Sequence, residues 1–426
     1  MRNTAVAIAL IAALAGAASL AAADANSVLL RGGTVHPVSG PEIANGSVLV
    51  VDGKIAGVGA NIAAPKGVRV LNVRGLHVYP GMIDSATQLG LTEIGAVDMT
   101  NDTSDIGDFN PQLRAVIAVN PASEHIPVTR ANGITAAIAA PEGSLISGQA
   151  ALIRLDGWTW EQMAAAPSAA MMLTFPTIQT RRSYRQRGAT PFEEAKKEYD
   201  KKVQRLHEYF EEARRYQRAK AAGAPGLAAD VRYEAMLPVL EGRQPLVIRA
   251  VRERAIRDAL KFAEKQPKVR VVIAGAMEAY KAIPELKAAG VPVILGPTLE
   301  LPLEEDDAYD RMYTAPAELH KAGIRFAFGS FSASFSRNLP YQAANAVAYG
   351  LPYEDALKAV TLTAAEIWGV ADRMGSIAEG KSADLIVTDG DPLETRTHIR
   401  HEFIAGREVD LSNKHLRLYE QYMSRP

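Results

Sequence analysis

Short apolar runs recur through the middle of this 426-residue chain, separated by longer stretches with helical spacing. Short apolar runs bounded by polar residues are typical of buried strands. One helical stretch places Ile256, Ala259, Leu260 and Ala263 on a single face. Strands that alternate with helices predict an α/β protein, and eight of them predict a (β/α)8 TIM-like barrel. The runs are residues 78–84, 133–139, 150–155, 171–175, 246–250, 269–274, 291–295 and 324–328.

Both ends of the chain carry a second pattern, in which apolar runs are joined by turn residues. Asp52-Gly53 lies between the runs 47–51 and 54–59, and Asp-Gly in this place is a strong hairpin signal. The segment 381–409 shows the same pattern of apolar runs joined by turn residues. We therefore expect strands at both ends of the chain.

A charged helical segment interrupts the alternation at about residues 191–222. Glu193 and Lys197 stand four residues apart, as do Glu198 and Lys202, and such opposite pairs support a solvated helix. We expect an exposed helical insertion between the fourth and fifth barrel strands. A helix that docks a partner is the alternative.

The N-terminus is typical of a secretory signal peptide. One arginine precedes the apolar run 4–20, and alanines at 21–23 match a cleavage pattern of small residues. The alternative, a membrane anchor, requires a longer apolar run. We expect residues 1–24 to be a signal peptide and the mature protein to be periplasmic or secreted, with no membrane attachment after cleavage.

Composition removes several classes of function. The net charge is −1 with 22% charged residues, so nothing indicates a nucleic-acid partner. Cysteine is absent, which excludes disulfides, thiolate metal sites and cysteine nucleophiles. Serines follow the last strand run at 330, 332, 334 and 336, but they lack a nucleophile-elbow motif.

The run 79–88 resembles the entry to the barrel of the amidohydrolase superfamily, where the pattern is P-G-[LMF]-I-D-x-H-x-H. Its frame is intact here as Pro80, Gly81, Met82, Ile83 and Asp84. The segment 339–387 is similar to the imidazolonepropionase-related branch of that superfamily. The resemblance implies a hydrolase of C–N bonds other than peptide bonds, with a catalytic metal that is usually zinc.

The resemblance also implies a division of the chain. Both termini would build a small β-sandwich from residues 25–80 and 376–412. Residues 81–375 would form the barrel, with the insertion at about 191–222. Residues 413–426 would form a C-terminal tail.

The positions that hold the metal in this superfamily carry other residues here. The strand-one histidines are replaced by Ala86 and Gln88, and those of strands five and six by Arg249 and Gly275. The strand-eight aspartate is replaced by Phe331, or at best Ser330. A hydrolytic metal needs imidazole or carboxylate ligands and an open position for water. We therefore expect no metal cofactor, assign no catalytic residue, and predict a pseudoenzyme with a vestigial pocket at these six positions.

Three functions stay open. A pseudoenzyme could bind a small molecule, form a homo-oligomer, or join an intact amidohydrolase relative. An active hydrolase could use a rebuilt, metal-independent site. A binding protein could hold a carboxylate or phosphate with Arg249. If Arg249 is instead paired within the chain, we expect Glu300, Glu278 or the acidic loop 91–110 as its partner.

Overall fold

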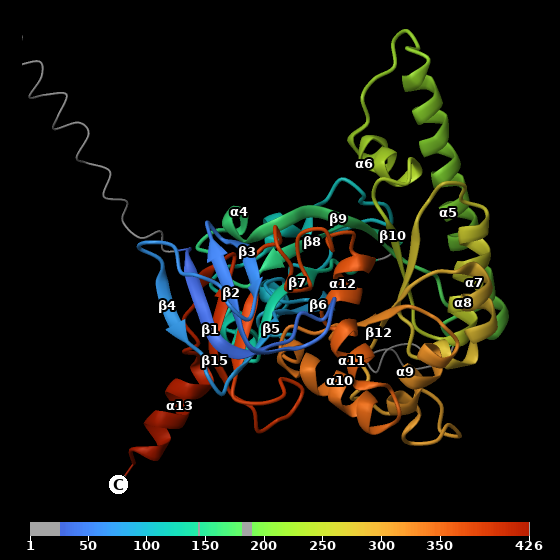
Figure 1. The fold of residues 1–426 in the computed structure, drawn as a ribbon. Helices are drawn as coiled ribbons and strands as arrows, with labels where there is room; N and C mark the ends of the chain where they lie inside the picture. The colour runs from blue at the N-terminus through green and yellow to red at the C-terminus, as the bar shows by residue number, and fades with distance from the viewer. Residues whose placement is uncertain (1–25, 144, 181–189, 426) are drawn as a thin grey trace, which may run out of the picture.

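The computed structural model describes residues 26–143, 145–180 and 190–425, so the expected signal peptide, residues 1–24, lies outside the described residues. Two sheets of eight strands each organise the chain, and most helices cover the second sheet (Figure 1). Within the described residues, every helix is too short or too polar to cross a membrane.

The first sheet joins the two ends of the chain. Its order is β16-β15-β14-β5-β1-β2-β3, and β4 pairs with β1. The antiparallel pairing of β5 with β14 connects the N-terminal strands to the C-terminal ones. The strands are β1 (Val28–Val35), β2 (Ile43–Val51), β3 (Lys54–Gly59), β4 (Arg69–Asn72), β5 (His77–Pro80), β14 (Leu385–Thr388), β15 (Ile399–Ile404) and β16 (Arg407–Glu408).

The predicted Asp-Gly hairpin joins β2 to β3. Val51 pairs with Lys54, and both residues between them have positive φ, 51° at Asp52 and 78° at Gly53. A two-residue hairpin turn of type I′ needs positive φ at both central residues, which Asp-Gly tolerates. The hairpin prediction is therefore confirmed.

The second sheet is a barrel in which one strand runs against the others. Its order is β13-β12-β11-β10-β9-β8-β7-β6. All neighbours are parallel except β8, which is antiparallel to both β7 and β9. The strands are β6 (Met82–Thr87), β7 (Ile134–Ala139), β8 (Ile146–Arg154), β9 (Ala164–Thr174), β10 (Leu246–Ala250), β11 (Val271–Gly275), β12 (Val293–Leu295) and β13 (Phe326–Phe328).

The regular (β/α)8 prediction is thus correct in strand number and overall class but wrong for the third strand. Only residues 140–145 separate β7 from β8. A parallel return needs a crossover of a dozen or more residues, so a connection this short can only turn the chain back.

Gly81 separates the two sheets and corrects the prediction of one strand over residues 78–84. β5 ends at Pro80 in the first sheet, and β6 begins at Met82 in the barrel. A Cβ added to Gly81 would lie 2.1 Å from the Thr135 hydroxyl oxygen, so no side chain fits there. Glycine is required because β6 and β7 approach closely at this point.

Helices follow the later barrel strands and bury their apolar faces against them. In α7, Ile256, Ala259 and Leu260 are buried, as their spacing predicts, whereas Ala263 is only half-buried. The helices are α2 (Ala115–Ala118), α3 (His125–Arg130), α4 (Trp160–Met163), α5 (Phe192–Ala221), α6 (Val231–Leu240), α7 (Glu253–Glu264), α8 (Ile283–Ala289), α9 (Arg311–Lys321), α10 (Leu339–Ala348), α11 (Tyr353–Ala359), α12 (Leu362–Ile367) and α13 (Lys414–Met423). Short 3-10 helices are η1 (Asp98–Thr100), η2 (Ala279–Lys281) and η3 (Ser336–Asn338).

The charged segment forms α5, which lies between β9 and β10 as predicted. Together with α6 it projects from one side of the barrel, in green in Figure 1. Its buried side chains include Leu206, Tyr209 and Phe210, while most of its charged residues are exposed. The helical insertion is therefore anchored by one apolar face.

Two apolar clusters divide the barrel strands between inside and outside. One contains Met82, Ile248 and residues of the surrounding helices. The other contains alternate strand positions, among them Ile83, Val247 and Ala274, together with residues of α12. Side chains alternate between the two faces of a strand, so the second cluster is the barrel interior. The interior is a packed apolar core.

Candidate functional site at the barrel mouth

The carboxyl ends of the barrel strands bring most of the predicted site positions together. The Phe331 N–H donates to the Ala86 carbonyl at 2.8 Å, which joins the end of β6 to the loop after β13. A Cβ on Gly275 would lie 3.7 Å from Cγ of Arg249. Gln88 lies just beyond β6, where its carbonyl accepts two turn hydrogen bonds. Five of the six positions therefore share one mouth, and among the described residues no hydrogen bond joins the Gln88 side chain to them.

Phe331, which the resemblance places with Ser330 at the family's aspartate position, packs over the barrel interior. It is half-buried and packs against the apolar barrel interior, which includes Ala86 and Ala274. Its φ of 51° is unusual for a bulky residue and indicates a backbone held in place by its surroundings. The Arg249 guanidinium carbon lies 5.8 Å from the centre of the Phe331 ring, within range of a cation–π contact.

Arg249 is paired within the chain, and its partner is Glu142. The expectation of Glu300, Glu278 or the acidic loop 91–110 is therefore wrong. Glu142 follows β7, and its N–H donates to the Thr103 carbonyl at 2.7 Å. Both side chains of the ion pair are about a third exposed (32% and 31%), so solvent screens the attraction. The sequence signal that was missed is a lone carboxylate directly after the second barrel strand.

Asp84 is a fully buried carboxylate beneath the mouth. Its Oδ1 accepts from the Ser330 N–H at 2.9 Å and the Ala86 N–H at 3.3 Å, and its Oδ2 accepts from the Ser336 hydroxyl at 2.6 Å. Burial raises the pKa of Asp84 to about 6, although these hydrogen bonds oppose the shift. Asp84 thus ties β6 to the loop after β13, a role that the sequence pattern did not indicate.

The residues of the mouth do not fit a hydrolytic metal. Ala86, Gly275 and Phe331 offer no side-chain ligand atom, and the cationic Arg249 would repel a divalent ion. Both oxygens of Asp84 already accept hydrogen bonds. Across the residues that the structure describes, no three His, Asp or Glu side chains converge in a metal-binding group.

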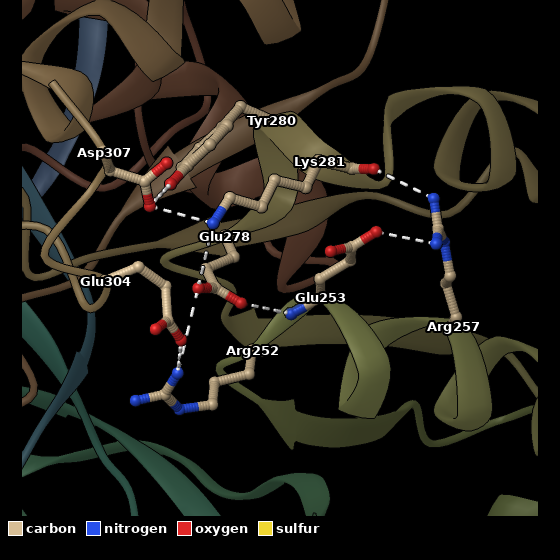
Figure 2. A network of polar contacts seen from close by, with 8 residues as sticks. All are labelled: Arg252, Glu253, Arg257, Glu278, Tyr280, Lys281, Glu304 and Asp307. Carbon is tan, nitrogen blue, oxygen red and sulfur yellow. Dashed lines mark hydrogen bonds and ion pairs between the residues drawn. The ribbon is translucent and has the colours of Figure 1, made fainter.

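A network of charged side chains fixes the rim beside β10 and β11 (Figure 2). Glu278, which is 4% exposed, accepts from the Glu253 N–H at 2.7 Å and from Lys281 at 3.3 Å. Lys281 also donates to Asp307 at 2.8 Å. Arg252 pairs with Glu304. The network therefore holds the loop after β12, residues 296–310, against the ends of the preceding strands.

Titration within this network follows from its contacts. Partial burial alone would lower the pKa of Lys281, but the hydrogen bond to Asp307 and the charge of Glu278 outweigh it and raise the pKa. Partial burial and the hydrogen bond to Asp307 raise the pKa of Tyr280 to about 12. Lysine and tyrosine both keep their protons at neutral pH, which suits a structural clamp rather than a general base.

Comparison with known proteins supports the superfamily. The model of the amidohydrolase family matches residues 285–410. Amidohydrolase tasK of Hapsidospora irregularis is 25% identical over 386 residues, which cover 82% of this chain. That match spans 38% of the length of tasK.

Solved structures have the same fold. An amidohydrolase from Thermotoga maritima MSB8 is 26% identical, with a TM-score of 0.78 over 90% of this chain and 99% of that chain. Molinate hydrolase is 16% identical, with a TM-score of 0.54 over 90% of this chain and 95% of that chain, and shows the fold alone. Taken together, these findings show a mixed α/β chain that resembles amidohydrolases in sequence and in fold.

Proposed function

We propose that this protein is an exported amidohydrolase of the imidazolonepropionase-related branch that has lost metal-dependent hydrolysis and binds a small molecule at its barrel mouth. The observation that carries the proposal is the pair formed by Phe331 and Arg249. An aromatic ring closes the barrel interior at the end of β13, and a guanidinium lies over that ring.

The chemistry of these residues supports the loss of hydrolysis. Attack on a C–N bond at neutral pH needs an activated water and a stabilised oxyanion, which a metal supplies in this superfamily. Phe331 and Ala86 supply neither a ligand nor a base. Two carboxylates lie near Phe331: Glu142 is paired with Arg249, and Asp84 is fully buried with its oxygens engaged by Ser330 and Ser336. Asp84 therefore has no open side on which to receive a substrate water.

The ion pair also bears on the alternative of an Arg249 anion site. Glu142 already neutralises the guanidinium, so an incoming carboxylate must displace an internal one. The cavity lined by Arg249, Glu142, Thr174 and Phe331 has a volume of about 10 Å³, too small for such a ligand. Binding is therefore assigned to the mouth beyond Phe331 rather than to Arg249.

An assay of turnover tests the loss of hydrolysis. Purified protein would be incubated with a panel of amides and cyclic ureides in the presence of Zn²⁺, Fe²⁺ or Mn²⁺, and separately with a chelator. The Thermotoga maritima amidohydrolase, assayed in parallel, controls for metal loading. We expect no metal-dependent turnover. Metal-stimulated hydrolysis that the chelator abolishes would refute the proposal.

A further inference from the structure

A cavity of about 220 Å³ lies between the loops after β12 and β13, and Phe331, which also lines the small cavity beside Arg249, forms part of its wall. It has room for about seven waters at roughly 30 Å³ each, or for a small organic molecule. The two loops contribute all of its lining except one residue of α10. The lining residues are Pro297, Leu299, Glu300, Ser330, Phe331, Ser332, Phe335, Asn338 and Gln342.

The loop over this cavity carries negative charge only. Residues 297–310 contain Glu300, Glu304, Glu305, Asp306, Asp307 and Asp310, and no lysine, arginine or histidine. Arg252 neutralises Glu304 and Lys281 neutralises Asp307, as Figure 2 shows. Glu300 lines the cavity and has no ion-pair or hydrogen-bond partner among the described residues. This loop therefore favours a cation over an anion, while Arg337 of the loop after β13, 6.0 Å from the Phe335 ring, contributes one opposite charge.

The Gln342 amide is a second, independent feature of the cavity. Gln342 is 3% exposed, and its Oε1 accepts from the N–H and the hydroxyl of Thr298, both at 3.1 Å. These two bonds fix its amide nitrogen as a donor, which has no partner within the described part of the chain. This nitrogen is not fully buried, so an acceptor in the cavity can reach it. An acceptor oxygen on a ligand in this cavity would satisfy it.

The walls are apolar and partly aromatic. Phe331 and Phe335 line the cavity together with Leu299 and Pro297. Phe335 is 55% exposed and Leu299 is 40% exposed, so both lose contact with water if a ligand binds. An aromatic face beside a carboxylate is also a favourable setting for an ammonium group.

We propose that this cavity binds a small protonated amine that has an apolar body and one hydrogen-bond acceptor. The ammonium group meets Glu300, the acceptor meets the Gln342 amide, and the apolar body lies between Leu299 and Phe335. This inference rests on the proposed binding function of the barrel mouth and names the ligand class for it.

Calorimetric titration with matched probes tests the ligand class at mildly acidic pH, where the amines are protonated. Phenylalaninamide carries the ammonium, the acceptor and the apolar body. Hydrocinnamide lacks only the ammonium, and phenethylamine lacks only the carboxamide. Hydrocinnamate lacks the ammonium and carries a carboxylate in place of the carboxamide. We expect phenylalaninamide to bind roughly three to five times more tightly than hydrocinnamide, which is the gain expected from a partly exposed ion pair. Hydrocinnamate should bind most weakly.

Variants locate the charge that makes this difference. Glu300→Gln should remove the preference for phenylalaninamide over hydrocinnamide. Glu305→Gln is the matched control, because Glu305 is an unpaired carboxylate on the same loop that does not line the cavity. It should keep most of the preference. Both positions are exposed, so neither change should affect folding.

Two results would overturn the inference. The first is that hydrocinnamide or hydrocinnamate binds as tightly as phenylalaninamide, or that none of the probes binds. The second is an unchanged preference in Glu300→Gln. Either result would leave the loss of hydrolysis untouched. Metal-dependent turnover would refute the proposed function even if the amines bind, so the two failures are distinguishable.

Discussion

Replacing Asp84 by asparagine should remove a pH dependence of stability that the buried carboxyl imposes. Asp84 is fully buried, and burial raises its pKa from 3.8 to about 6. Asparagine has the same shape. Its oxygen can still accept from Ser330 and Ala86, and its amide can donate to the Ser336 hydroxyl. The substitution therefore changes the titration more than the contacts.

The sign and size of the effect follow from linkage. The folded protein keeps the Asp84 proton to a higher pH than the unfolded chain does. The associated stability is present below about pH 4 and is lost as the pH rises through about 6. A shift of about two pKa units corresponds to about 3 kcal/mol. For roughly 400 ordered residues that unfold with about 2 cal/mol/K of entropy each, this equals about 4 °C in Tm.

Scanning calorimetry between about pH 4 and about pH 8 measures this difference. The Tm of wild type minus that of Asp84→Asn should fall by about 4 °C across the range and then stay constant. Asp306→Asn, at an exposed carboxylate, is the control and should parallel wild type. A Tm difference between wild type and Asp84→Asn that does not change with pH would show that Asp84 titrates normally, and the reasoning from burial would fail.

Three further changes test other parts of the structure by denaturation. A double-mutant cycle with Arg249→Met and Glu142→Gln should give a coupling of about 0.5–1 kcal/mol, because both groups are partly exposed; a coupling near zero would mean that the pair does not form in solution. Gly81→Ala should lower the free energy of unfolding by more than about 4 kcal/mol, because the new Cβ would lie 2.1 Å from Thr135 Oγ1. A soluble variant with wild-type Tm would refute this contact. Glu402→Gln should be more stable than wild type at alkaline pH but not near pH 4. The reason is that burial raises the pKa of Glu402, and neither of its carboxylate oxygens has a hydrogen-bond partner among the described residues. Equal gains of Glu402→Gln at both pH values would contradict that account.

Apolar runs located every barrel strand but did not determine strand direction. The run 150–155 lies in β8, which runs opposite to its neighbours. Direction depends on connection length, and the short interval before β8 was the available signal. β9 begins at Ala164, well before the predicted residue 171. The prediction missed this first part because its alanines, Pro167 and Ser168 lack the β-branched side chains that are typical of strands.

The site was predictable where a motif fixed the position and unpredictable where distant elements meet. Arg249 and Phe331 were placed at the mouth by their strand positions, and the structure brings them together. The pairing with Glu142 was missed because it joins β10 to the loop after β7, and no local pattern encodes such a contact. The unpaired Glu300 was noted only as a partner for Arg249, whereas it lines a different cavity.

The metal content of the purified protein tests the central claim most directly. The chain would be expressed in medium supplemented with zinc, iron and manganese, purified without chelators and examined by elemental analysis, with the Thermotoga maritima amidohydrolase treated identically. With Ala86, Gly275, Arg249 and Phe331 at the mouth, we expect far less than one bound transition metal per chain. About one tightly held zinc, iron or manganese ion per chain would contradict the account.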